Sequence, residues 1–173
     1  MRKDVIGLII GITLLAITVP MLIAFVLGLI LDDNPQNTSI SFGIPIFISL
    51  SLGLFLFRRT KSQVNSRHVR DREAFVAVAL AWPAVVLIGA LPYWLGGMFW
   101  GPFNDAPGLL ELIRGFVNSW FESMSGFTTT GATVISETSS PVCMGEAIAF
   151  DCINAQSKGL LLWRSLTQWL GGM

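Results

Sequence analysis

Three long apolar runs without a charged residue constrain the fold of this chain more than any other feature of its sequence. They cover residues 5–31, 40–57 and 74–100. An α-helix needs about 20 consecutive apolar residues to cross the hydrocarbon core of a bilayer, and each run reaches or approaches that length. Of the 173 residues, 13% are charged, whereas about a quarter are charged in soluble domains. The sequence therefore predicts an all-α, multi-pass membrane protein.

The first run has a competing interpretation as a secretory signal peptide, because it follows a basic start at Arg2 and Lys3. A signal peptide has a shorter apolar core and ends at a cleavage site with small residues. This run is longer and shows no clear site of that kind. We therefore favour a retained helix with a kink at Pro20.

The distribution of basic residues predicts the orientation of the helices. The connector after the second run is rich in them, at Arg58, Arg59, Lys61, Arg67, Arg70 and Arg72. Basic loops stay in the cytoplasm, so this connector and the N-terminus are predicted to be cytoplasmic. A contact with lipid headgroups or a partner is the alternative role of its charge. His68 has no ligand-type companions there and is expected to be solvated.

Several residues are expected at or beyond the outer face of the membrane. An interfacial aromatic belt is predicted from Tyr93, Trp94, Phe99, Trp100, Trp163 and Trp169. The outer loops hold the acids Asp32, Asp33, Asp105, Glu137, Glu146 and Asp151. These acids could modestly concentrate cations at the outer face. Alternatively, the acidic character of the outer loops is only the result of keeping basic residues on the inside. The sequence pattern leaves both interpretations open. Residues 37–39 also fit a glycosylation acceptor pattern.

Residues 109–127 mix apolar side chains with Glu111, Arg114, Asn118 and Glu122. The segment is too polar to face lipid all round and too apolar for an exposed loop. We predict a re-entrant helix that enters from outside, with its C-terminal end pointing into the membrane. An amphipathic helix on the membrane surface is the alternative.

The stretch 126–134, Gly-Phe-Thr-Thr-Thr-Gly-Ala-Thr-Val, follows that segment. Three consecutive threonines are poor helix formers, and Gly131 permits unusual backbone angles. The chain is predicted to leave the helix at about Gly126 and to run on extended. Such backbone can aim successive carbonyl oxygens along one line and replace the hydration shell of a monovalent cation. The negative pole of the helix dipole also favours a cation nearby.

The more polar stretch 136–158 is predicted to be an outer loop, and it contains Cys143 and Cys152. A disulfide between them suits an oxidising compartment, and two unpaired thiols are the alternative. Residues 159–173 begin a fourth spanning helix. Near its outer end, snorkelling of Arg164 is favoured over pairing with Glu122 or Glu137.

The composition argues against an enzyme. The three apolar runs contain no Asp, Glu, His, Lys or Arg that could act as acid, base or ligand. One His and two Cys in the whole chain are too few for a transition-metal centre. We expect membrane lipid, and not nucleic acid, as the surroundings of the chain.

Residues 120–133, Trp-Phe-Glu-Ser-Met-Ser-Gly-Phe-Thr-Thr-Thr-Gly-Ala-Thr, resemble the first pore loop of the Trk/Ktr family of potassium-uptake proteins. Residues 162–173 are similar to the start of that family's following helix. The two additional N-terminal helices and the stretch Gly89-Ala90-Leu91-Pro92 are similar to the bacterial Trk type. The resemblance covers nearly the whole chain.

The resemblance implies a potassium-channel-like fold of four helix–pore loop–helix repeats around one potassium path. Residues 1–72 would be two N-terminal transmembrane helices with the basic loop. Residues 73–173 would be the first repeat, truncated in its last helix. The family also implies potassium uptake across the bacterial inner membrane, a homodimer, and a cytoplasmic nucleotide-binding regulatory subunit.

The resemblance assigns the potassium-binding carbonyls to Thr129, Thr130, Gly131 and Ala132, with Thr133 at the outer mouth. Some plant relatives that favour sodium have a serine at the position of Gly131, so glycine here indicates potassium. The family implies potassium as the transported ion and no cofactor.

Two departures from the family are visible. The outer loop 139–158, with its two cysteines, is longer than expected. One repeat of four is present, and one pore loop cannot surround an ion. The N-terminal portion of a Trk-type subunit is therefore the first interpretation, and a truncated membrane fragment that inserts without transporting is the alternative.

Overall fold

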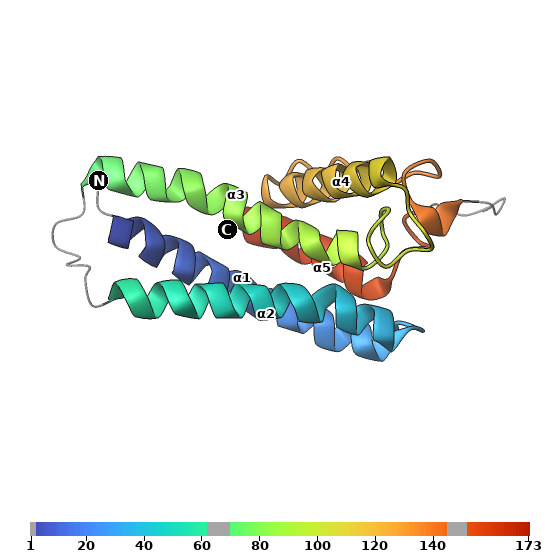
Figure 1. Cartoon of the computed structure of the whole chain (residues 1–173), viewed down its shortest axis with the longest axis horizontal. Helices are drawn as coiled ribbons and strands as arrows, with labels where there is room; N and C mark the ends of the chain where they lie inside the picture. Colours follow the sequence, from blue (N-terminus) through green and yellow to red (C-terminus); the bar gives the residue numbers. More distant parts are fainter. Residues whose placement is uncertain (1–2, 62–69, 145–151) are drawn as a thin grey trace.

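The computed structural model describes residues 3–61, 70–144 and 152–173, and over these residues it contains helices and no β-strand. The elements are α1 (Lys3–Leu31), α2 (Pro35–Lys61), α3 (Asp71–Leu95), α4 (Leu109–Phe127), the 3₁₀-helix η2 (Pro141–Cys143) and α5 (Lys158–Gly171). Figure 1 shows α1, α2 and α3 along the whole bundle, with α4 and α5 beside one part of it. The prediction of an all-α protein is confirmed over the described residues.

Among the described residues, α1, α2 and α3 are the helices long and apolar enough to cross a membrane. Their most apolar windows are between 28% and 39% buried inside the protein. Large apolar side chains such as Val19, Phe47 and Phe75 point outward, with 60%, 73% and 77% of their surface exposed. An apolar surface of this kind on three adjacent helices suits a lipid environment. The chain is therefore embedded in a membrane.

Small and hydroxyl-bearing residues let α1 and α2 approach closely. The hydroxyl of Ser49 on α2 donates a hydrogen bond to the carbonyl of Leu14 on α1 at 2.8 Å. Thr18 donates to the same carbonyl, also at 2.8 Å, and to Ser49 at 3.1 Å. Both hydroxyls are buried, and small and hydroxyl residues are typical of such contacts between membrane helices. α1 continues through Pro20 to Leu31.

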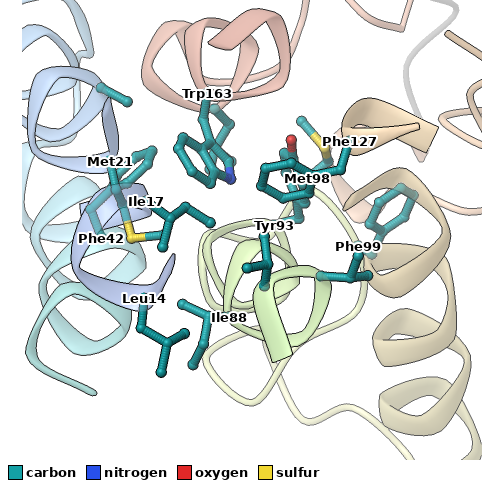
Figure 2. Packing of buried hydrophobic residues seen from close by; sticks show 14 of the residues in the cluster. Leu14, Ile17, Met21, Phe42, Ile88, Tyr93, Met98, Phe99, Phe127 and Trp163 are labelled. Atoms are coloured by element: carbon teal, nitrogen blue, oxygen red, sulfur yellow. The ribbon is translucent and has the colours of Figure 1, made fainter. Parts of the chain in front are cut away.

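The core of the bundle combines aliphatic and aromatic side chains and joins all five α-helices to the loop after α3 (Figure 2). Tyr93, Phe99 and Trp163 have 0% of their surface exposed, and the indole of Trp163 donates a hydrogen bond to the carbonyl of Gly89 at 3.0 Å. These three aromatic residues therefore pack against neighbouring helices and do not face lipid, whereas their predicted depth at the membrane interface stays a prediction. Trp169, 62% exposed, does lie on the surface.

Asp32, in the turn between α1 and α2, caps the N-terminus of α5. Its carboxylate accepts hydrogen bonds from the Ser157 hydroxyl and the Lys158 amide, both at 2.7 Å, and from the Thr38 hydroxyl at 3.0 Å. A carboxylate at this position satisfies free amide groups and complements the helix dipole. Asp32 thus joins two segments that are 126 residues apart in the sequence. The sequence had suggested only that Asp32 is one of several acids at the outer face, and it did not predict this structural role.

The glycosylation pattern falls on a residue with a structural contact. Asn37 lies inside α2, and its side-chain amide donates a hydrogen bond to the carbonyl of Gly96 at 3.0 Å. This hydrogen bond ties the start of α2 to the end of α3. The amide nitrogen that a glycan requires is therefore already bound to the protein.

We expect Asp32→Ala to lower the free energy of unfolding by about 2 kcal/mol, because charged hydrogen bonds and a helix cap are lost together. Thermal unfolding of the purified protein in detergent measures the effect. Asp33→Ala is the matched control, since Asp33 is the exposed neighbour in the same turn. Equal unfolding midpoints for the two variants would contradict the capping role.

Candidate functional site

The candidate site is the loop of residues 128–134, which follows α4 directly. Figure 1 shows α4 alongside α3, with its axis along the bundle. Helix α4 begins at the end of the bundle where the loop after α3 lies, and it ends partway along the bundle. The chain then returns to the same end, where η2 and the start of α5 are found. The loop therefore lies within the length of the bundle.

α4 is held at its first turn and along its length. The side chain of Glu111 accepts a hydrogen bond from the Gly108 amide at 2.8 Å, which satisfies a backbone donor at the N-terminus of the helix. Further along, the Ser123 hydroxyl donates to the carbonyl of Val86 on α3 at 2.9 Å. These contacts fix the position of α4 against α3.

The last turn of α4 is packed closely between α3 and α5. A Cβ atom on Gly89 of α3 would lie 2.7 Å from the Phe127 ring, and a Cβ on Gly126 would lie 2.3 Å from the Thr167 hydroxyl. The ring of Phe127 meets that of Trp163 edge to face, with 6.4 Å between the centroids. The start of the loop is therefore placed by tight backbone packing.

The backbone of the loop first continues the hydrogen bonding of the helix, and it then enters the left-handed region of φ at two residues. The amides of Thr129 and Thr130 donate to the carbonyls of Gly126 and Ser125 at 2.9 and 3.0 Å. Thr129 and Gly131 have φ angles of 58° and 71°. The helix ends at Phe127, one residue beyond the predicted exit at about Gly126, and the expectation of extended backbone directly after it is wrong because hydrogen-bonded turns follow at Thr128 and Thr129.

The left-handed conformation of Thr129 is unfavourable, since a β-branched residue there is an outlier. Its cost is about 1–2 kcal/mol. Strained residues of this type are found at functional sites, where the surrounding structure holds them in place. The strained backbone of Thr129 and the threonine-rich sequence therefore both indicate this loop as the functional site.

The predicted binding residues lie together on the surface of the chain. Residues 128–133 are all exposed. The carbonyl of Gly131 accepts a hydrogen bond from Arg164 at 3.3 Å, and that of Ala132 accepts one from the Ser125 hydroxyl at 2.6 Å. Each carbonyl oxygen has two lone pairs, so one on each remains for another ligand.

Glu122 of α4 and Arg164 of α5 form an ion pair beside this loop. The second carboxylate oxygen of Glu122 accepts hydrogen bonds from the Thr133 hydroxyl at 3.1 Å and the Val134 amide at 3.3 Å. The preference for snorkelling of Arg164 is therefore wrong. A buried carboxylate is costly without a partner, and Arg164 lies on the helix that packs against it.

The outer end of the loop is closed by a disulfide, which was one of the two alternatives that the sequence left open, and by hydrogen bonds that the sequence did not indicate. The structure joins Cys143 and Cys152 in a disulfide. The buried amide of Gln156 donates to the Ser140 hydroxyl at 3.0 Å and to the Cys152 carbonyl at 3.2 Å. The Ser139 hydroxyl donates to the Val134 carbonyl at 2.5 Å. Five residues on which the sequence predictions drew lie outside the described residues: Arg2, Arg67, His68, Glu146 and Asp151.

Comparison with known proteins finds curated relatives over most of the chain. It is 28% identical over 168 residues to the Trk system potassium uptake protein TrkH of Escherichia coli strain K12, which is 95% of this chain and 27% of that protein. It is 30% identical over 147 residues to TrkI of Halomonas elongata, which is 85% of this chain and 23% of the relative.

An archaeal protein named as an uncharacterized cation transporter, from Methanocaldococcus jannaschii, is 31% identical over 139 residues. That alignment covers 80% of this chain and 22% of the archaeal protein. No protein-family model matches the chain. The chain spans about a quarter of the length of the curated relatives that it matches.

Proposed function

We propose, from the relationship of this chain to the Trk potassium-uptake proteins, that it forms one wall of a potassium path across the membrane. The resemblance that residues 120–133 predicted is confirmed by the curated relatives, which are named for potassium or cation transport. Those relatives are transporters and not enzymes. The transported ligand is K⁺, and no covalent step is required.

The observation that carries this proposal is the exposed loop 128–133, whose backbone is held from behind by hydrogen bonds. Carbonyl oxygens in a fixed backbone can replace the water around a potassium ion. We assign this role to the carbonyls of Thr129, Thr130, Gly131 and Ala132, and the outer mouth to Thr133. The C-terminal end of α4 adds the negative pole of its dipole.

The course of α4 supports a re-entrant pore helix. Its axis follows that of α3 (Figure 1), whereas a surface helix would lie across the membrane-spanning helices. Irregular backbone at membrane depth is tolerated where it lines a water-filled cavity. A loop at this depth with an exposed backbone edge is therefore suited to line an ion path.

One loop of this kind cannot surround an ion, so other loops must complete the path. The exposed face of α4 supports the presence of further loops beside this one. It carries apolar side chains at intervals of four residues, at Leu109, Ile113, Val117 and Phe121, which other parts of the assembly would cover. We propose that further helix–loop–helix units cover this face. In this arrangement residues 73–173 form the first repeat, and residues 1–72 precede it as two transmembrane helices.

The remaining assignments follow from the same relationship. The basic end of α2, at Arg58, Arg59 and Lys61, supports a cytoplasmic location for that end and for the N-terminus. We propose a location in the bacterial inner membrane, a homodimeric subunit, and a cytoplasmic nucleotide-binding partner that regulates it.

Rubidium uptake into proteoliposomes tests the proposal. The complete transport assembly containing this chain should accumulate rubidium, a potassium substitute, and excess potassium should compete more effectively than excess sodium. Residues 1–173 by themselves should give no uptake, because one loop leaves the ion unsurrounded. Absence of uptake by the complete assembly would instead favour a membrane fragment that inserts without transporting.

A further inference from the structure

The Glu122–Arg164 ion pair lies directly behind the loop and is shielded from solvent. The side chain of Glu122 is 0% exposed and that of Arg164 is 19% exposed. They come from different helices, α4 and α5, which enclose the beginning of the loop. A buried ion pair is weak evidence for stability, because desolvation offsets the attraction between the charges. Its place beside the loop therefore calls for another explanation.

The two side chains of this ion pair form hydrogen bonds with the loop at two positions. The guanidinium of Arg164 binds Glu122 through Nε and donates through Nη2 to the carbonyl of Gly131 at 3.3 Å. The other carboxylate oxygen of Glu122 receives the Thr133 hydroxyl and the Val134 amide. The two contacts lie on either side of Ala132, so they fix the direction of the chain through the centre of the loop.

We propose that Glu122 and Arg164 are positioning residues that determine the cation selectivity of the loop. This inference depends on the proposed function of the loop. Arginine suits this role because its guanidinium has five donors in a planar fork, so one side chain binds a carboxylate and a carbonyl together. The pair has no net charge, so it holds the loop without adding net charge beside the ion path.

Three variants in the complete transport assembly test the proposal. Arg164→Lys retains the positive charge but replaces the planar fork with a single ammonium group, which cannot reproduce both contacts. Glu122→Gln retains the shape but removes the carboxylate, and Glu122→Gln/Arg164→Gln removes both charges. We measure initial rubidium uptake in competition with sodium, maximal uptake rate, and the amount of folded protein in the membrane.

We expect each single variant to lower the preference for rubidium over sodium about tenfold, as the loss of a charge-assisted hydrogen bond implies. Because the two residues act as one unit, the double variant should lose no more than the larger single effect. The Arg164→Lys protein should reach the membrane in normal amounts. A change in selectivity at constant protein amount is a result that a purely structural role does not produce.

Arg114→Lys and Glu137→Gln are the matched controls, since both residues are exposed, and they should leave selectivity unchanged. Wild-type selectivity in Arg164→Lys and Glu122→Gln would overturn the positioning role while leaving the proposed function in place. If Glu122→Gln or the double variant fails to fold, Arg164→Lys decides the question. A wild-type assembly that does not discriminate between the two ions would overturn both proposals together.

Discussion

Replacement of Gly131 by alanine should reduce the preference of the complete assembly for potassium over sodium about tenfold. A Cβ atom at this position would lie 3.4 Å from the side-chain amide of Gln168, so space is available. The difficulty is the φ angle of 71°, which costs an L-residue about 1–2 kcal/mol. Relief of that strain would rotate the peptide groups around residue 131 and redirect their carbonyl oxygens. Rubidium uptake in competition with sodium measures the change.

Gly43→Ala is the control for this substitution, because no atom lies within 4 Å of the added Cβ and the residue lies in α2, away from the loop. It should leave both uptake and selectivity unchanged. Unaltered selectivity in Gly131→Ala would show that the loop backbone at this position does not coordinate the transported ion.

Replacement of Gly115 by alanine should lower the free energy of unfolding by about 3 kcal/mol, which is the upper range for overpacking. A Cβ at Gly115 would lie 1.8 Å from the backbone carbonyl of Trp100. Because the obstacle is backbone and not a flexible side chain, α4 must move away from the loop after α3. Uptake should fall with stability, since the displaced helix carries residues 128–134.

Thermal unfolding in detergent and the amount of folded protein in membranes measure this second effect. Gly108→Ala is the matched control in the N-cap position of the same helix, where the nearest atom to the added Cβ is 3.6 Å away. A Gly115→Ala protein as stable as the Gly108→Ala protein would show that α4 is not packed against Trp100 in the membrane.

Properties that depend on local composition were predictable from the sequence. Apolar length identified the three spanning helices, because the thickness of the hydrocarbon core imposes it on each helix independently. The polar residues among the apolar ones of residues 109–127 indicated a separate helix, which the structure shows as α4. The run of threonines with one glycine indicated where the backbone leaves that helix, correctly to within about two residues.

Properties that depend on which helix lies beside which were not predictable in the same way. Tyr93, Phe99 and Trp163 looked like interfacial anchors, and the structure buries them in the core. The rule for aromatic residues describes depth in the membrane, and it does not state whether a side chain faces lipid or another helix. Asp32 illustrates the same limit, since its hydrogen-bond partners at the start of α5 are more than 120 residues away.

The sequence by itself determined the membrane environment, the positions of the spanning helices and the identity of the threonine–glycine loop, because each rests on a continuous stretch of residues. The tertiary structure decided that Arg164 pairs with Glu122, and that this pair holds Gly131 on one side and Thr133 on the other. Burial of a charge requires a partner brought close by helix packing. That proximity is a property of the folded bundle and of no single segment.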